Sequence, residues 1–292
     1  MRLRADDTDL DLDPADGGRI TSLRLHGTQV LGGAGERTFQ YGCFVMAPYA
    51  GRVRDGRFDY DGLPRTLPLT LGRHAGHGTV LEQPWRVDDR GPSWALLSCD
   101  LGPSWPWSGT VAHRVELAHD SLRLTLRMQS EEDTFPAMLG WHPWFRRRLC
   151  DGGAGAEIDL RAASMAQRDA AGIPTGRRVT PPDPPWDDAF TDVAWPISLT
   201  WPGRLQIEID SDCPWAVVYN EDPRAVCVEP QTGPPDQFNA TPRLVGPAEP
   251  LTAWSTWRWR AGPTEDVDRT QDDPTEEGQA GYSGARSGYM RR

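Results

Sequence analysis

One glutamate stands inside an otherwise apolar segment, where a carboxylate has no structural use. Glu229 lies in the run C-V-E-P-Q-T-G-P-P-D (Cys227–Asp236), in a strand-like segment that stops at Pro230. Burial in such a segment should raise the pKa of this carboxyl group. A carboxylate tuned toward neutrality is what a general base working near pH 7 requires.

A histidine that could serve as the matching acid lies in the segment G-W-H-P-W-F (Gly140–Phe145). Pro143 forces His142 into an extended conformation and stops a helix from running through it. The alternative is that His142 is a structural residue at the end of an aromatic strand and only donates a hydrogen bond to a backbone carbonyl. Histidine is intermediate in burial, so a half-buried structural histidine is common. The segment alone leaves both interpretations open.

A second histidine, His77, lies between two glycines in G-R-H-A-G-H-G-T-V. This setting predicts an exposed ring that is free to contact a ligand, although turn geometry also accounts for the glycines. His74 and His77 are a candidate metal pair, but no cysteine or further histidine stands nearby at ligand spacing. The sequence therefore predicts no metal site.

Two further segments offer side chains suited to sugar hydroxyls. Arg52, Arg54 and Arg57 recur in A-G-R-V-R-D-G-R-F, and a guanidinium group binds vicinal hydroxyls through its planar fork. Asp55-Gly56 also predicts a hairpin turn, in which case Arg54 and Arg57 are solvated and Arg52 points inward.

The second segment is P-P-W-D-D-A-F, where Trp186 and Phe190 bracket Asp187 and Asp188. Acids flanked by aromatic rings can grip a sugar beside a stacking face. Aspartate is also common in loops because it favours turns, so this signal has a purely structural explanation as well.

The elements that must position these residues are predicted to be β-strands. Glycine (30) and proline (27) punctuate short segments rich in valine, leucine and tryptophan. Apolar residues alternate in Ser121–Met128, Leu205–Ile209 and Trp254–Trp259, which is typical of half-buried strands. The best helix candidate, Arg161–Ala171, is short. The pattern predicts an all-β protein with a large β-sandwich.

Composition excludes several functions. The 292 residues carry a net charge of −11, which argues against a nucleic-acid partner, and all 31 basic residues are arginine, which excludes lysine-based Schiff-base chemistry. No apolar stretch approaches the roughly 18 residues of a membrane span, and the N-terminus lacks a signal-peptide core. Five widely spaced cysteines suggest reduced thiols, so we expect a cytoplasmic protein without membrane contact.

The chain divides at about residue 260. Residues 1–260 carry the strand pattern and predict one globular domain, near the upper limit of single-domain size. Residues 261–292 contain few apolar side chains and are acidic in their first half, a composition that predicts a disordered tail.

Taken in order, five segments make this chain resemble the aldose 1-epimerase (galactose mutarotase-like) family. They are P-Y-A-G-R-V-R-D-G-R-F, the H-G-T-V region, G-W-H-P-W-F, W-D-D-A-F and V-E-P-Q-T-G-P-P-D. The resemblance implies a supersandwich fold and an isomerase that interconverts the α and β anomers of a free sugar without a cofactor.

By this resemblance, Glu229 is the general base and His142 the general acid, while the substrate-binding residues are Arg52, His77, Asp187 and Gln231. The sequence departs from the family pattern at Gly51, where asparagine is common, and at Trp141, where tyrosine is common. The choice of Asp187 over Asp188 stays open. We expect a small-molecule sugar as partner and a monomer or homodimer.

Two alternatives remain open at this point. A hexose-6-phosphate 1-epimerase would add a phosphate pocket, for which the consecutive arginines Arg146, Arg147 and Arg148 are the available feature. A non-catalytic sugar-binding or sensor protein would use the same sandwich but would tolerate loss of the acid or the base. The presence of both Glu229 and His142 counts against it.

Overall fold

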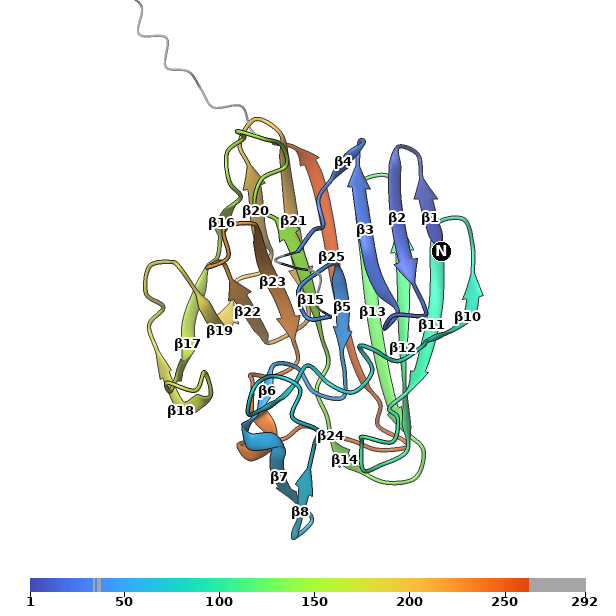
Figure 1. The fold of residues 1–292 in the computed structure, drawn as a ribbon, viewed down its shortest axis with the longest axis vertical. Helices are drawn as coiled ribbons and strands as arrows, with labels where there is room; N and C mark the ends of the chain where they lie inside the picture. The colour runs from blue at the N-terminus through green and yellow to red at the C-terminus, as the bar shows by residue number, and fades with distance from the viewer. Residues whose placement is uncertain (34, 36–37, 263–292) are drawn as a thin grey trace, which may run out of the picture.

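A computed structural model of the protein describes residues 1–33, 35 and 38–262. The structure is built almost entirely of antiparallel β-strands in two large sheets that lie face to face (Figure 1). The predicted all-β sandwich is therefore confirmed. The predicted tail lies outside the described residues from residue 263 onward.

The larger sheet has 11 strands. In spatial order they are β1 (Arg2–Ala5), β2 (Thr8–Asp13), β3 (Arg19–Leu25), β5 (Cys43–Met46), β15 (Gly140–Arg146), β23 (Ala225–Gln231), β22 (Trp215–Tyr219), β19 (Asp187–Val193), β17 (Ala162–Arg168) and β18 (Pro174–Val179), with β4 (Thr28–Gln29) paired to β3. Strands far apart in the chain, such as β5, β15 and β23, become neighbours at its centre.

The second sheet has eight strands. In order they are β10 (Arg86–Arg90), β11 (Trp94–Asp100), β12 (Gly109–Leu117), β13 (Ser121–Ser130), β25 (Leu251–Ala261), β21 (Leu205–Ser211), β20 (Ile197–Trp201) and β16 (Glu157–Asp159). The alternation predicted for Ser121–Met128 is present, because Leu122, Leu124, Leu126 and Met128 are all fully buried.

Short elements complete the structure at one end of the sandwich (Figure 1). Three two-stranded ladders pair β14 (Phe135–Pro136) with β24 (Leu244–Val245), β6 (Arg52–Val53) with β9 (Ala75–Gly76), and β7 (Arg57–Tyr60) with β8 (Leu63–Thr66). Two 3-10 turns, η1 (Arg54–Gly56) and η2 (Gln237–Asn239), adjoin them. Among the described residues no helix is long and apolar enough to cross a membrane.

The central strand β15 is buried on both faces. Its odd-numbered side chains face the second sheet, where Trp141 Nε1 donates a hydrogen bond to His113 Nε2 (3.2 Å) and the Phe145 ring lies 5.0 Å from that of Trp257. Its even-numbered side chains, His142 and Trp144, point to the opposite face. The apolar character of the G-W-H-P-W-F segment follows from this double burial.

Two local predictions were wrong. Residues 161–171 do not form a helix, because Ala162–Arg168 is strand β17 and pairs with β18 and β19 on its two sides. The hairpin near Asp55 exists, but its turn is Asp61-Gly62 between β7 and β8, while Asp55-Gly56 lies in η1. In the first case pairing with distant residues of β19 overrides the local signal, whereas in the second case another Asp-Gly pair, Asp61-Gly62, closes the hairpin instead.

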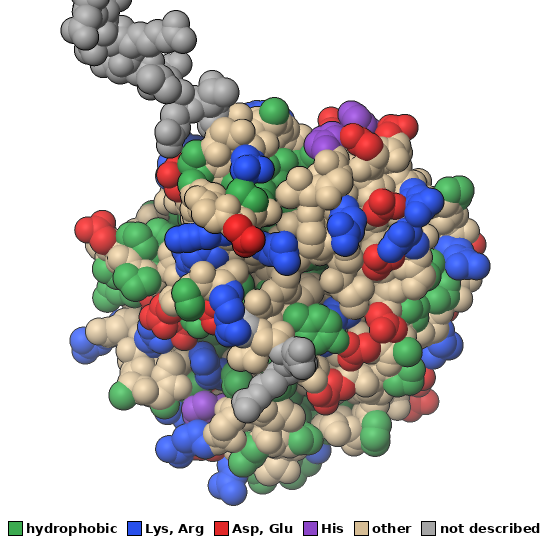
Figure 2. All heavy atoms as spheres, turned by 45° about the horizontal axis from the view of Figure 1, so that its top comes forward, with side chains coloured by type: hydrophobic (Ala, Val, Ile, Leu, Met, Phe, Trp, Pro, Cys, Tyr) green, Lys and Arg blue, Asp and Glu red, His purple; other side chains and the backbone are tan. Residues whose placement is uncertain are grey.

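The surface carries both signs of charge. On the face shown in Figure 2, arginine and acidic side chains are interspersed around hollows in the surface. The net charge of the full sequence is −11, so acidic side chains outnumber basic ones.

Candidate active site

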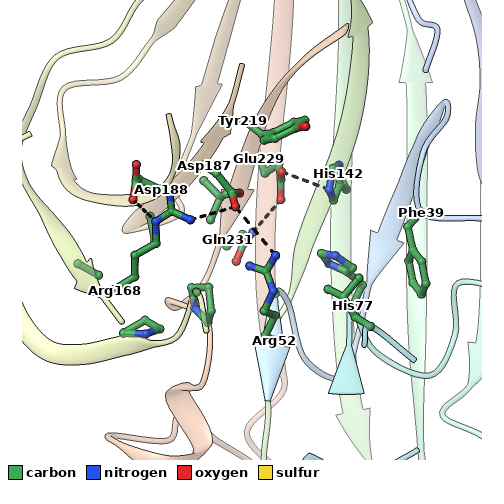
Figure 3. A pocket seen from close by; sticks show the side chains of 18 of the residues that line it. Phe39, Arg52, His77, His142, Arg168, Asp187, Asp188, Tyr219, Glu229 and Gln231 are labelled. Carbon is green, nitrogen blue, oxygen red and sulfur yellow. Dashed lines mark hydrogen bonds and ion pairs between the residues drawn. The ribbon is translucent and has the colours of Figure 1, made fainter. Parts of the chain in front are cut away.

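The outer face of the larger sheet carries a cavity of about 380 Å³. It lies over the central strands, and the β6–β9 ladder and the loop after β9 border one side (Figure 3). The antiparallel register places Glu229, Val217 and Ala189 side by side on β23, β22 and β19, and all three line the cavity. Residues far apart in the chain thus converge because they occupy the same face of adjacent strands.

A buried carboxylate–imidazole pair forms the floor of this cavity. His142 Nε2 lies 3.3 Å from Glu229 Oε1, and Gln231 Nε2 donates a hydrogen bond to Glu229 Oε2 at 3.0 Å. Glu229 is 2% exposed and His142 is 6% exposed. In Figure 3 the two side chains point toward each other from neighbouring strands. The sequence prediction that these two residues act together is consistent with this geometry.

Aromatic rings fix the orientation of the His142 imidazole. Its ring stacks on Phe44 at a centroid distance of 4.7 Å and on Trp144 at 5.2 Å. Phe44 is the cross-strand partner of His142 on β5, and Trp144 follows two residues later on β15. The strand period of two therefore explains why this histidine is flanked by aromatic residues in the sequence.

Burial disfavours charge on both members of the pair. Desolvation raises the pKa of the Glu229 carboxyl well above its ordinary value, and the nearby Asp187 carboxylate adds to the rise. Desolvation also lowers the pKa of the His142 imidazole well below its ordinary value, with further contributions from His77 and Arg19. Because the two groups are in contact, they share protons and titrate as one coupled unit.

His77 lies beside the pair, in a backbone conformation that is unusual for histidine. Its φ is +59°, and the following Gly78 has a φ of +91°. A Cβ at Gly78 would lie 2.0 Å from the Ala47 carbonyl oxygen, so this position requires glycine. The glycine after His77 is therefore explained by close packing of the backbone.

The His77 ring is half-buried, so the prediction of a well-exposed ring was wrong. It packs edge-on to the His142 ring at 5.1 Å, and its Nδ1 contacts the Met46 sulfur at 3.0 Å. Burial lowers the pKa of His77 to about 3, which leaves the imidazole neutral and able to hydrogen-bond a hydroxyl. His74 serves the fold instead, because its Nδ1 accepts the Asp55 backbone N–H at 3.1 Å.

Charged side chains line the opposite wall of the cavity. Arg168 Nη1 donates to Asp187 Oδ2 at 3.2 Å, and Arg52 Nη2 lies 4.0 Å from the same oxygen. Burial raises the pKa of Asp187, while Arg52 and Arg168 oppose the rise. The Asp187 side chain remains 25% exposed, so its carboxylate can accept hydrogen bonds from the hydroxyl groups of a ligand.

Asp188 differs from its neighbour in burial and in contacts. Its side chain is 8% exposed, and its Oδ1 lies 2.9 Å from Arg168 Nε. Because consecutive strand residues point to opposite faces, only one of the two acids can project fully into the cavity. Asp187 therefore presents its carboxylate to the cavity, while Asp188 holds Arg168 in place.

Three residues at the cavity were not identified from the sequence. Arg168 lies in the segment interpreted as a helix candidate, and its spacing gives no hint of the contact with Asp187 and Asp188. Phe39 lies beside His77 with a ring distance of 5.5 Å, and Tyr219 faces Trp144 at 5.8 Å. Tyr219 is an aromatic residue with a hydroxyl group at an alternating position of β22. This was the feature of the sequence that could have indicated it.

The consecutive arginines considered for phosphate binding do not reach this cavity. Arg147 turns inward and donates to the Asp222 and Asn220 carbonyl oxygens, at 3.0 Å for Asp222. Arg146 and Arg148 border a separate hollow together with Arg224. Arg146 is four positions after His142 on β15, which corresponds to about 13 Å along the strand.

The fold and the site together define a galactose mutarotase-like β-sandwich with a buried carboxylate–imidazole pair on its outer face. A family model described as aldose 1-epimerase matches residues 14–255. The chain therefore belongs to the aldose 1-epimerase family, as its sequence motifs predicted. No curated protein matches the sequence.

Several solved structures share this fold. A putative aldose 1-epimerase from Escherichia coli K12 has 19% identity and a TM-score of 0.77, over 89% of this chain and 98% of that chain. A galactose mutarotase-like protein from Clostridium acetobutylicum has 15% identity and a TM-score of 0.79, over 89% and 94%. A galactose 1-epimerase from Lactobacillus acidophilus NCFM has 17% identity and a TM-score of 0.75, also over 89% and 94%.

Proposed function

We propose that this protein is an aldose 1-epimerase that interconverts the α and β anomers of a free aldose by acid–base catalysis. The observation that carries the proposal is the buried pair of Glu229 and His142, with 3.3 Å between the carboxylate oxygen and the imidazole nitrogen. Side chains that can bind hydroxyls surround this pair in a cavity of about 380 Å³. Anomerisation requires one base and one acid, and it needs no cofactor.

In the first half-reaction the proton that the pair shares lies on His142, so Glu229 can take the proton from the C1 hydroxyl while His142 gives its proton to the ring oxygen. The C1–O5 bond breaks as the C1 carbonyl forms, and the open-chain aldehyde results. Both oxygens are bonded to C1, so a base and an acid in contact with each other can reach both. Each proton transfer contributes roughly 10²–10⁴-fold to the rate.

In the second half-reaction the C1–C2 bond rotates and the ring closes on the other face of the carbonyl. His142 now takes the proton from the attacking hydroxyl, and Glu229 returns its proton to the new C1 oxygen. The stacked rings of Phe44 and Trp144 keep the imidazole in place during this exchange. Asp187, Arg52, His77 and Gln231 are proposed to hold the remaining hydroxyls.

Charge in the cavity favours a neutral sugar over its 6-phosphate. Arg52 and Arg168 both lie against Asp187, and Arg168 also pairs with Asp188. A phosphate dianion usually needs two or more converging arginines that are free to bind it. We therefore propose that free aldoses are used with a kcat/KM at least comparable to that of their 6-phosphates.

Anomer exchange on a panel of free and phosphorylated aldoses, followed by NMR or polarimetry, tests this function. Acceleration for at least one free aldose is expected. Binding without acceleration would favour a sugar sensor instead. A preference of about 100-fold or more for a 6-phosphate, worth roughly 2.7 kcal/mol, that is lost when Arg146 and Arg148 are replaced would establish the phosphorylated substrate.

A further inference from the structure

A cysteine thiol adjoins the acid–base pair, and the reaction described above gives it no role. Cys227 lies two residues before Glu229 on β23, so both side chains point to the same face of the sheet. Its cross-strand partners are Trp144 on β15 and Tyr219 on β22, and the cysteine is fully buried. The thiol forms no disulfide.

The ligand atoms of these three residues form a compact group. One nitrogen of His142, the sulfur of Cys227 and one carboxylate oxygen of Glu229 all lie within 4.8 Å of one another. All three side chains are buried. Among the residues that the structure describes, this is the one group of His, Cys, Asp and Glu side chains that meets this spacing.

Imidazole, thiolate and carboxylate are the three ligand types that zinc takes in proteins. Tetrahedral bonds of about 2.0–2.1 Å to N and O and about 2.3 Å to S place ligand atoms roughly 3.3–3.6 Å apart. The 3.3 Å between His142 Nε2 and Glu229 Oε1 already matches this spacing. The sulfur lies within 4.8 Å of the other two ligand atoms, so it needs to approach by at most about 1.2 Å to reach the roughly 3.6 Å expected for a sulfur ligand.

Neighbouring groups support the same arrangement. Gln231 donates to the second oxygen of Glu229 at 3.0 Å, which leaves the other oxygen directed at His142. Hydrogen bonds of this kind orient metal-binding carboxylates in known sites. The cavity above the pair leaves room for a water or hydroxyl as the fourth ligand.

We propose that His142, Cys227 and Glu229 bind a thiophilic divalent cation, with Zn²⁺ as the physiological candidate, and that this cation switches the site off. Binding replaces the thiol proton, which passes to solvent as the sulfur–metal bond forms. The cation occupies the lone pairs that the acid and the base need for proton transfer. The inhibition rests on the proposed function, whereas the binding does not.

Binding is tested on metal-free protein with Co²⁺ as a spectroscopic substitute for Zn²⁺. We expect a thiolate-to-cobalt charge-transfer band with one equivalent bound, and displacement of Co²⁺ by Zn²⁺. Cys227→Ser should lose this band and weaken binding by roughly tenfold or more. Cys43→Ser and Cys150→Ser are the controls, one buried and one half-buried, and should retain it.

A cobalt band that persists in Cys227→Ser but disappears in Cys150→Ser would overturn the proposal, as would the absence of any band. If Cys227→Ser does not fold, as judged by circular dichroism, Cys227→Ala takes its place. Displacement of the wild-type band by a saturating aldose then supplies the same evidence without a variant. An aldose that the protein turns over but that fails to displace the cobalt would contradict a site on the catalytic pair.

Inhibition is measured separately by anomer exchange with Zn²⁺ and with Mg²⁺ as the hard-cation control. We expect Zn²⁺ alone to inhibit, reversal by a chelator, and a half-inhibitory concentration at least about tenfold higher in Cys227→Ser. Equal inhibition of wild type and Cys227→Ser would refute the role of the thiol. If no aldose reacts at all, the proposed function fails while the cobalt titration still decides the site.

Discussion

Replacing Glu229 with glutamine removes the proposed base while keeping the size of the side chain. Glutamine can preserve both contacts of the glutamate. Its oxygen can accept a hydrogen bond from Gln231, and its amide nitrogen can donate a hydrogen bond to Nε2 of the neutral His142. The fold should therefore survive. The loss of basicity should lower kcat by roughly 10²–10⁴-fold, which corresponds to about 2.7–5.4 kcal/mol of transition-state stabilisation.

The assay is anomer exchange measured by NMR at several aldose concentrations, so that kcat and KM are obtained separately. Glu221→Gln is the matched control, since Glu221 lines the same cavity but is exposed at its rim. The control should keep its kcat within a few-fold. A folded Glu229→Gln protein with near-normal kcat would refute the assignment of the base.

The same variant should become relatively more stable as the pH rises. Because burial raises the pKa of Glu229, the folded state holds this proton more tightly than the unfolded state does. Wild-type stability then falls as the pH rises from the ordinary glutamate pKa of about 4.3 through the raised folded value. Glutamine has no proton to lose, so its melting temperature should gain on wild type over this interval.

Three further predictions concern other parts of the chain. If the active form is the one in which Glu229 and His142 together hold one proton, the pH profile of the rate is bell-shaped. Its acid limb lies below the ordinary histidine pKa, and its alkaline limb lies above the ordinary glutamate pKa. His142→Asn should lose one limb and most of the rate; retention of both would transfer the acid role to His77. Asp187→Asn should raise KM. Asp188→Asn should mainly lower the free energy of unfolding, by roughly 1 kcal/mol in chemical denaturation. The reverse result would exchange the roles of the two aspartates. A chain that ends near Pro263 should keep its activity and melting temperature, and marked destabilisation in calorimetry would contradict a dispensable tail.

The fold class followed from the sequence because alternation is a local signal. In Ser121–Ser130 each buried leucine sits two residues from the next, and this spacing has one structural explanation. Ala162–Arg168 carries no such alternation, and its strand conformation depends on pairing with β18 and β19. Pairing between distant strands leaves no local pattern in a single sequence, so this segment resembles a short helix as much as a strand.

The site was predictable where chemistry and local pattern coincide in one residue. Glu229 and His142 are polar residues in apolar strands, so each is conspicuous by itself. Arg168 is an ordinary arginine in its segment, and its position follows only from contacts with Asp187 and Asp188 across β17 and β19. Its contribution depends on tertiary structure, and no spacing rule in the sequence could have supplied it.

The residues proposed for catalysis lie on strands, whereas some of those proposed to bind the substrate lie on short ladders and loops. The proposed acid and base, His142 and Glu229, lie on β15 and β23, central strands that are buried on both faces, so their separation is fixed by the sheet. Arg52 and His77 instead sit on the short β6–β9 ladder and the loop after it, beside Gly51 and Gly78 at positive φ. Gly51 has a φ of +64° and lies against Pro235, where an added Cβ would come within 2.8 Å of the proline Cγ. A larger residue at this position, such as the asparagine that the family resemblance leads us to expect, would require Pro235 to shift, so glycine here changes the packing of the loop as well as the side chain. Substrate preference can therefore change through these loops while the distance between acid and base stays the same.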